Sequence, residues 1–286
     1  MGVTIVGCGD IGTRLALAYR DEGVAVAGWV RTPQSAEKLR DSGIEAVQID
    51  LDQPLLPSSE FEPGWLYYFA PPPAQGVDES RVARFIEGLK AWPLPQKVVY
   101  LSTSGVYGDC QGEWVDETRP PSPLADRAKR RLDGELRWRA WSEQTGCPLV
   151  ILRVAGIYGP GKLPVERLRS GQPMVAEADA PITNHIHSYD LVKTARIAMQ
   201  RGVSGEVYNV CDGAPEPMTR YFNQVADFLG LPRPPVISLE EAQQQLSPGM
   251  LSYLRESRRL SNHKLLHGLG VELDYPDLRR GLPACV

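Results

Sequence analysis

The glycine-rich turn near the N-terminus constrains the fold of this chain more than any other feature. A short apolar run, Val3–Val6, leads directly into Gly7-Cys8-Gly9-Asp10-Ile11-Gly12, and an amphipathic stretch over residues 12–21 follows. This order predicts a strand, a tight turn and a helix. The first glycine allows the bend, the second lets phosphates approach the backbone, and the third lets the helix pack on the strand. The free N–H groups at the helix N-terminus then predict a pyrophosphate site formed by Gly7, Gly9, Asp10, Ile11 and Gly12.

Short apolar runs alternate with longer amphipathic stretches through the first two-thirds of the sequence. Strands are predicted at 24–30, 46–49, 65–70, 97–102, 149–153 and 206–210, and helices at 81–92, 125–145 and 190–201. Such alternation is typical of βαβ units with right-handed crossovers, and the nearly continuous apolar runs are typical of buried parallel strands. We therefore expect an α/β fold, a Rossmann-type doubly wound parallel sheet.

The remaining segments are irregular and rich in proline, glycine and charge. Residues 159–183 and 212–286 are expected to form a smaller, discontinuous C-terminal substrate lobe, with loops and short helices from Gly213 onward. The dinucleotide-binding Rossmann domain would comprise residues 1–158 and be completed by residues 184–211. We recognise no motif in the lobe that identifies the substrate.

Composition limits the classes of partner. The 286 residues are 42% hydrophobic and 23% charged, which is ordinary for a globular protein. The net charge of −4 does not favour binding to nucleic acid or to an anionic membrane. We recognise no apolar run long enough for a membrane span, and we expect no signal peptide. The five scattered cysteines form no CxxC pair, which argues against a disulfide framework or a metal site. These features predict a cytoplasmic protein that acts on a small molecule.

The end of the second predicted strand indicates which dinucleotide binds. It reads Gly28-Trp29-Val30-Arg31-Thr32 and lacks the carboxylate that would bind the adenosine ribose hydroxyls of NAD. Arg31 can instead bind a 2′-phosphate with help from Thr32, which favours NADP over NAD, although Arg31 also fits a plain solvated arginine. Further cofactor contacts are predicted after the third and fourth strands, at Asp50, Leu51, Phe69, Ala70 and Pro71.

Four later segments strengthen this interpretation. They read LSTSGVYG at 101–108, LRVAGIYGPG at 152–161, IHSYDL at 186–191 and GEVYNV at 205–210. Together with the glycine turn they resemble the extended short-chain dehydrogenase/reductase family, the NAD-dependent epimerase/dehydratase group. The resemblance implies a nicotinamide cofactor and chemistry at a hydroxyl or keto carbon of a small polar substrate, nucleotide sugars among them. It also implies that Thr103 orients the reacting oxygen and contacts the cofactor.

The family's catalytic tyrosine and lysine, YxxxK, have no clear counterpart here. A phenol acts as a base when a nearby cation lowers its pKa, which is the role of that lysine. Anchored on Ser122-Pro123, the alignment puts Leu124 at the tyrosine and Ala128 at the lysine; anchored on Lys129, it puts Ala125 at the tyrosine. Neither register supplies a tyrosine. The pattern most resembles an atypical, YeeZ-like branch of the family.

Other groups are candidates for the missing acid/base role. Tyr107 is one, although a packing role is the alternative, and Lys129 can reach the cofactor ribose or lie on a solvated helix face. Asp109, Cys110 and Asp116 are weaker candidates, and His185 and His187 are expected to be structural. The family's 4,6-dehydratases carry Asp-Glu directly after the threonine; Ser104-Gly105 stand there in this chain, which argues against water elimination.

Two functions fit these observations. The first is an NAD(P)-dependent oxidoreductase or epimerase with a non-standard active site. The alternative is a non-catalytic NAD(P)-binding sensor or regulatory protein, which the missing tyrosine favours and the retained threonine opposes. Relatives often dimerise through helices such as that predicted at 125–145, so a homodimer is a candidate assembly, with Trp138 and Trp141 in the contact or in the core.

Overall fold

The computed structural model describes residues 2–55 and 64–286, and its centre is one parallel sheet. The sheet has seven strands in the order β12-β7-β5-β4-β1-β2-β3, and every pairing within it is parallel. The strands are β1 Val3–Val6, β2 Val26–Val30, β3 Glu45–Gln48, β4 Trp65–Tyr68, β5 Lys97–Thr103, β7 Leu149–Val154 and β12 Val207–Val210. The strand order reverses direction between β1 and β4, and ligands of doubly wound sheets bind at that point. The predicted fold class is confirmed.

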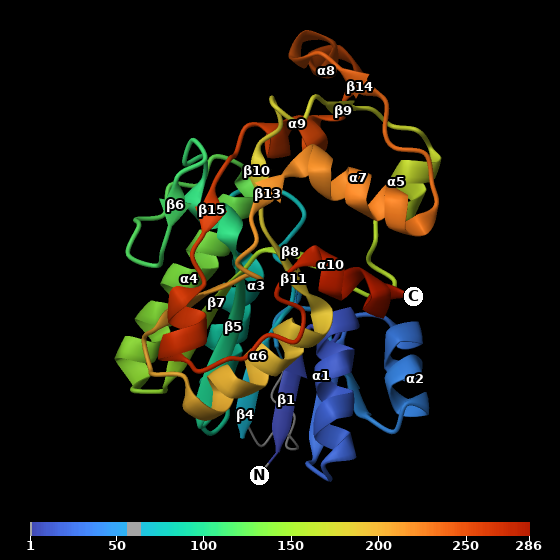
Figure 1. Cartoon of the computed structure of the whole chain (residues 1–286). Helices are drawn as coiled ribbons and strands as arrows, with labels where there is room; N and C mark the ends of the chain where they lie inside the picture. The colour runs from blue at the N-terminus through green and yellow to red at the C-terminus, as the bar shows by residue number, and fades with distance from the viewer. Residues whose placement is uncertain (1, 56–63) are drawn as a thin grey trace.

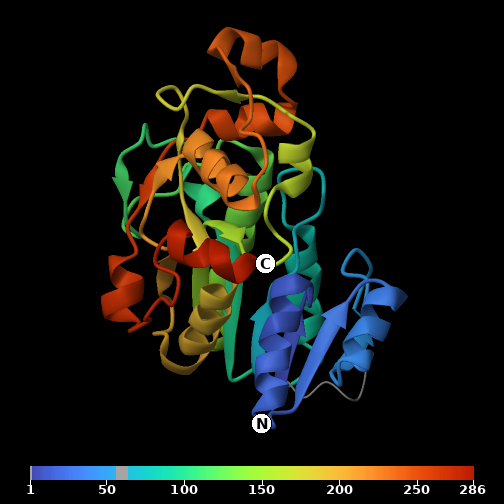
Figure 2. The ribbon, with the colours of Figure 1, turned by 45° about the vertical axis from the view of Figure 1, so that its right-hand side comes forward.

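Helices cover both faces of this sheet (Figures 1 and 2). On one face, α1 (Asp10–Asp21), α2 (Pro33–Asp41) and α6 (Ser188–Arg201) pack their apolar side chains into one core cluster. On the other face, α3 (Ser80–Leu89) and α4 (Asp126–Thr145) pack into a second cluster. Trp138 and Trp141 belong to this second cluster, so of their two predicted roles the structure shows the core one. Leu136, by contrast, is exposed on α4.

Local sequence explains where these helices begin and end. Thr32 caps α2 by accepting a hydrogen bond from the Ser35 N–H, and Pro33 follows at the first helical position, where its missing N–H costs nothing. Gly146 ends α4 in the left-handed conformation, at φ 73°, which glycine adopts without steric penalty.

Most elements beyond the central sheet are short, and they lie above the carboxyl ends of its strands in Figure 1. They are β8 Gly156–Tyr158, α5 Val165–Arg169, β9 Met174–Val175, β10 Ile182–Thr183, β11 His185–His187, β13 Glu216–Pro217, α7 Met218–Leu229, β14 Val236–Ile237, α8 Leu239–Gln245 and α9 Pro248–Leu254. Sequence analysis expected only short helices after Gly213, but α7 has twelve residues. Its apolar residues Tyr221, Phe222 and Val225 recur at helical spacing and are buried, which is the signal that was overlooked.

The C-terminal segment returns from this region to the sheet. β15 (Arg259–Leu260) pairs with β6 (Trp114–Val115), and a π-helical turn follows at Lys264–Gly268. Leu265, Leu269 and Val271 pack into the same core cluster as α6. The chain closes with α10 (Leu278–Gly281) and a 3₁₀ turn, Leu282–Cys285. The tail therefore contacts both parts of the molecule, and the predicted division into two domains stays a prediction. No helix among the described residues is long and apolar enough to cross a membrane.

Candidate functional site

The glycine turn between β1 and α1 is built from very close backbone contacts. Gly7 has φ +83°, and a Cβ placed on it would lie 2.3 Å from the Cα and N atoms of Ala70 at the end of β4. A Cβ on Gly12 would meet Ile5 at 3.1 Å, so the helix lies directly on its strand. A Cβ on Gly9 would meet nothing within 4 Å, and Gly9 caps α1 without any side-chain hydrogen bond. The first N–H groups of α1 thus face open space, which fits a bound pyrophosphate.

This turn forms one end of a cavity of about 460 Å³ at the carboxyl ends of β1, β2 and β4. The cavity brings together all the residues that sequence analysis assigned to the cofactor except Thr103. Its lining includes Gly7, Gly9, Asp10, Ile11, Gly12, Arg31, Thr32, Asp50, Leu51, Phe69, Ala70 and Pro71. No carboxylate follows β2, and Arg31, Thr32 and Ser35 lie together at that end of the cavity.

Sequence analysis missed two cations at the rim of this cofactor cavity. Lys162 lines it, and its Nζ lies 3.2 Å from the Asp10 carboxylate in the first turn of α1. Arg81 also lines it, bonds Asp52 at 2.6 Å and donates to the Pro71 carbonyl at 3.0 Å. The charge of Asp10, which would otherwise oppose a phosphate, is therefore balanced by Lys162 and by Arg14 at 3.1 Å. The signal for Lys162 was its place directly after the YGPG segment.

Thr103 lies instead in a second cavity, also of about 460 Å³, between β5, α4 and the C-terminal part of the chain. Its Oγ1 accepts a hydrogen bond from the Gly105 N–H at 3.2 Å, so the residue does cap the following turn. The hydroxyl proton remains available to a ligand. The predicted orienting role of Thr103 and its structural capping role are therefore compatible.

Two arginines of α4 accompany Thr103 in this second cavity. Arg127 and Arg131 both line it, and they are four residues apart, which is the spacing of the YxxxK motif. Arg131 donates to the Ala70 carbonyl at 3.1 Å. Because Ala70 lines the cofactor cavity, this hydrogen bond joins a residue of one cavity lining to a residue of the other.

Lys129 is placed differently from these arginines. It is exposed, pairs with Asp126 at 3.1 Å and does not line either cavity, which is the solvated-face alternative. α4 itself contains no tyrosine. That this chain works without the family's YxxxK tyrosine stays a prediction.

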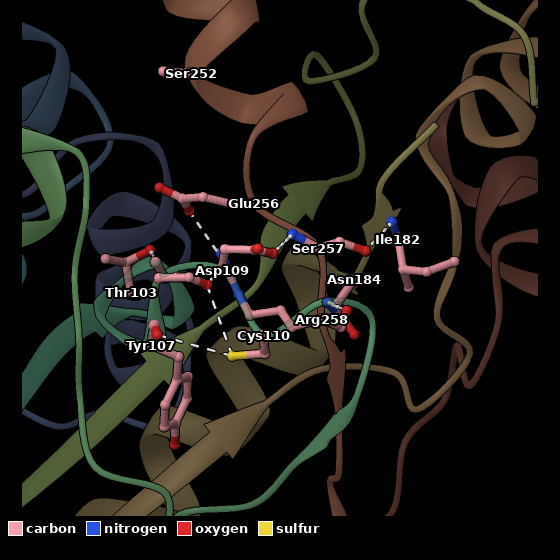
Figure 3. A network of polar contacts seen from close by, with 12 residues as sticks. Thr103, Tyr107, Asp109, Cys110, Ile182, Asn184, Ser252, Glu256, Ser257 and Arg258 are labelled. Carbon is pink, nitrogen blue, oxygen red and sulfur yellow. Dashed lines mark hydrogen bonds and ion pairs between the residues drawn. The ribbon is translucent and has the colours of Figure 1, made fainter. Parts of the chain in front are cut away.

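Glu256 and Arg258 form an ion pair that also lines the second cavity (Figure 3). Arg258 lies 3.1 Å from the Glu256 carboxylate and also donates to the Gly108 carbonyl at 2.6 Å. The other carboxylate oxygen, Glu256 Oε1, is buried, lies 4.0 Å from Arg127 and has no hydrogen-bond partner among the described residues. Sequence analysis did not identify either residue, because no motif surrounds them.

Tyr107 is not placed for acid/base chemistry in this cavity. Its hydroxyl donates to Asn209 Oδ1 at 2.8 Å, and the side chain is 1% exposed. Figure 3 shows its ring pointing away from Thr103. Burial raises the pKa of Tyr107 to about 12, which makes the phenol a poorer base at neutral pH. The structure therefore favours the packing role.

The other candidate groups also have structural partners. Asp109 accepts from the Gln111 and Ser257 N–H groups, and Asp116 caps Thr118 on the surface. Burial raises the pKa of the Cys110 thiol. Burial lowers the pKa of His185 to about 3 and that of His187 to about 4, so both imidazoles stay neutral. None of these five side chains lines either cavity.

Comparison with known proteins agrees with this arrangement. A sequence model of the NAD dependent epimerase/dehydratase family matches residues 78–211. Protein YeeZ of Escherichia coli is 27% identical to this chain, with 96% of each covered. A solved structure of a conserved, functionally unknown protein from Silicibacter pomeroyi is 32% identical and has a TM-score of 0.84. The match covers 99% of this chain and 98% of that chain. The chain belongs to the NAD dependent epimerase/dehydratase family. The resemblance that the sequence motifs indicated is thus confirmed.

A more distant member of the same fold has been solved with its cofactor. UDP-glucuronic acid 4-epimerase from Bacillus cereus, in complex with NAD, is 19% identical, has a TM-score of 0.76 and covers 100% of this chain and 97% of its own. At that identity the likeness shows the fold alone. Membership of the NAD dependent epimerase/dehydratase family, with the open glycine turn, supports a nicotinamide dinucleotide as the cofactor and epimerase-type chemistry.

Proposed function

We propose that this chain is an NADP-preferring oxidoreductase or epimerase that acts on a hydroxyl or keto carbon of a small polar substrate. One observation carries the proposal. Arg131, which lines the cavity of Thr103, donates a hydrogen bond to the carbonyl of Ala70, which lines the cavity of the glycine turn. A dinucleotide whose pyrophosphate lies on α1 would therefore present its nicotinamide end beside Thr103.

The residues of the second cavity would have different roles in the reaction. The bound nicotinamide supplies hydride transfer. Thr103 holds the reacting oxygen through its hydroxyl, and Arg131, bonded to Ala70 of the cofactor cavity, takes over the lysine's role toward the nicotinamide ribose. A guanidinium keeps its proton in proteins, so Arg127 and Arg131 bind and polarise but do not accept a proton.

The preference for NADP rests on the end of β2. Arg31 offers paired N–H donors, Thr32 and Ser35 add hydroxyls, and all three lie in the cofactor cavity. Fluorescence titration with NADPH and NADH tests this assignment. Arg31→Ala should weaken NADPH binding by about tenfold and leave NADH unchanged, because a charge-assisted hydrogen bond contributes about 1.5–3 kcal/mol. Lys38→Ala, on the exposed face of α2, is the matched control. Equal affinity for both cofactors, unchanged by Arg31→Ala, would show that no 2′-phosphate site exists.

Catalysis is tested by following deuterium from labelled NADPH into a panel of keto sugars and nucleotide sugars by mass spectrometry. Transfer to any member supports the enzyme, and Thr103→Ala should then reduce turnover strongly while cofactor binding is retained. Full turnover in Thr103→Ala would remove this residue from the mechanism.

The second candidate function is a non-catalytic NAD(P) sensor. The observation that favours it is the pair of arginines on α4 at the spacing of the tyrosine and lysine, since neither can exchange a proton. Tight cofactor binding with no label transfer across the whole panel would support this second function.

A further inference from the structure

We propose that the second cavity binds an oxyanion of the substrate, a carboxylate or a phosphate, between Arg127 and Arg131 and beside Thr103. The inference rests on the proposed function, because it concerns the substrate of the same site. It adds the chemical class of ligand, which neither the family nor the motifs define.

The two arginines share one face of α4. Residues four apart on a helix have Cβ atoms about 5–6 Å apart, so both guanidinium groups can reach one ligand group. Both side chains line the cavity that also contains Thr103. An arginine presents its donors in a planar fork that matches the paired oxygens of carboxylate and phosphate.

Arg131 keeps most of its hydrogen-bonding capacity for a ligand. One terminal nitrogen donates to the Ala70 carbonyl at 3.1 Å, and the guanidinium lies 6.0 Å from the Tyr100 ring centroid. Arg131 also acts on the buried carboxyl of Glu79, where it opposes the rise in pKa that burial causes, but the two form no ion pair within 4 Å. On the same helix, by contrast, Lys129 and Arg137 do not line the cavity and pair with Asp126 and Asp133.

Arg127 is held in place without being neutralised at close range. Its guanidinium lies over the Tyr253 ring at 4.1 Å and donates to Ser252 Oγ at 2.6 Å. The carboxylate of Glu256 is 4.0 Å away, which is beyond hydrogen-bond distance. Stacking on an aromatic ring orients the guanidinium plane and leaves its remaining donors directed at the cavity.

The charge balance of the cavity favours an anion. Among its described lining residues, Glu256 is the one acid against Arg127, Arg131 and Arg258. Glu256 already forms a close ion pair with Arg258, at 3.1 Å, so the two arginines of α4 leave a net positive charge. The buried Glu256 Oε1 has no hydrogen-bond partner among the described residues, so it can accept a hydrogen bond from a hydroxyl of the same ligand. The cavity therefore matches a hydroxylated acid better than a neutral sugar.

Calorimetric titration of the NADP⁺-saturated protein at constant ionic strength tests the proposal. Saturation with NADP⁺ keeps the anions away from Arg31 and the glycine turn. Three ligands of similar shape serve as probes: D-gluconate carries a carboxylate, D-glucitol 6-phosphate carries a phosphate, and D-glucitol is neutral. We expect at least one anion to bind about tenfold or more tightly than D-glucitol, and the tighter of the two identifies the group.

Variants then locate the bound anion. Arg127→Gln and Arg131→Gln should each reduce the affinity of the preferred anion by about tenfold, and Arg131→Lys, which keeps the charge but loses the fork, should fall between. Arg137→Gln is the matched control, because Arg137 lies on α4 but does not line the cavity, and it should bind as the parent does. Thermal unfolding confirms that each variant is folded.

Two results would overturn the proposal: equal binding of all three probes, or anion affinity unchanged in both Arg127→Gln and Arg131→Gln. Failure of the proposed function is separable from this. If NADP⁺ does not bind the parent protein, the proposed function fails, and the same three titrations without cofactor still decide whether Arg127 and Arg131 bind an oxyanion.

Discussion

Replacing Arg153 by methionine should lower the free energy of unfolding by about 3–5 kcal/mol. Arg153 on β7 bonds Glu135 on α4 through two contacts, at 3.1 and 2.7 Å, and the two side chains are only 4% and 1% exposed. Ser102 Oγ on β5 also donates to Glu135, at 2.6 Å. This network connects α4, which carries Arg127 and Arg131, to β7 and to β5, the strand that ends at Thr103.

The magnitude follows from what the substitution leaves behind. Methionine approximates the length of the arginine stem, so the main loss is the partner of a buried carboxylate rather than packing volume. Glu135 would keep only Ser102 as a hydrogen-bond donor among the partners described, and an uncompensated buried charge costs several kcal/mol. The contact of Arg153 with the Tyr107 ring, at 4.8 Å, is lost as well. At roughly 2 °C per kcal/mol for a chain of this size, the midpoint of thermal unfolding should fall by about 6–10 °C.

Urea unfolding followed by circular dichroism measures the change, provided that the slope with denaturant is unaltered. The double variant Glu135→Met/Arg153→Met should be more stable than Arg153→Met, because it removes the orphaned charge. Arg137→Met, which breaks only a half-buried pair with Asp133 on the same helix, should cost far less than Arg153→Met, about 1 kcal/mol at most. A loss below about 1 kcal/mol for Arg153→Met, or strict additivity in the double variant, would refute this account of the pair.

Three further predictions concern the turn and two buried titratable groups. Gly7→Val should abolish NADPH binding in fluorescence titration, because the new Cβ would overlap the backbone after β4. Gly23→Ala, at φ +73° with open space around it, should bind NADPH normally. Equal losses of binding in the two variants would show that the overlap at Gly7 is not the cause. Burial raises the pKa of Asp212 to about 8, so its contribution is present at low pH and is lost as pH rises from about 4 to 8. Asp212→Asn should therefore gain more stability over the parent in urea unfolding at pH 8 than at pH 5, and a pH-independent difference would count against it. Burial lowers the pKa of His185 to about 3, so the stability that it contributes above pH 6.5 is lost as pH falls toward 3. His185→Phe, which keeps the stacking on Tyr221, should reduce this loss when the free energy of unfolding is followed as the pH is lowered. An unchanged dependence of that free energy on pH would exclude His185 as its cause.

The fold could be predicted because its signals are local. The glycine turn, the apolar runs and Gly146 each fix a short stretch through backbone geometry or burial, and the sheet order follows from them by the rules for βαβ units. That the residues assigned to the cofactor would line one cavity could be predicted for the same reason, since they follow strands β1 to β4. Lys162 was missed because it is far from the glycine turn in the sequence and reaches it only through the folded structure, where it contacts Asp10.

The second cavity could not be predicted from the motif alone. Anchoring on Ser122-Pro123 or on Lys129 gave two registers, and neither selected Arg127 and Arg131. A helical reading would have done so: Arg127 and Arg131 recur at the same spacing as the buried Glu135, while Lys129 lies half a turn away on the solvated face. The Glu256–Arg258 wall had no such signal, because it depends on how the C-terminal segment returns to the sheet.

Under the proposed function, the arginines of α4 decide which step of the chemistry the protein itself can carry. The second cavity holds Arg127 and Arg131 at the spacing of the YxxxK motif, and both groups keep their protons at any physiological pH. Thr103 can pass a proton through its hydroxyl, but a neutral hydroxyl is too weak a base to be the final acceptor. The proton of a reacting hydroxyl would therefore have to leave through something other than α4. What α4 would provide instead is binding: two fixed positive charges in the cavity of Thr103, which select the substrate by its charge.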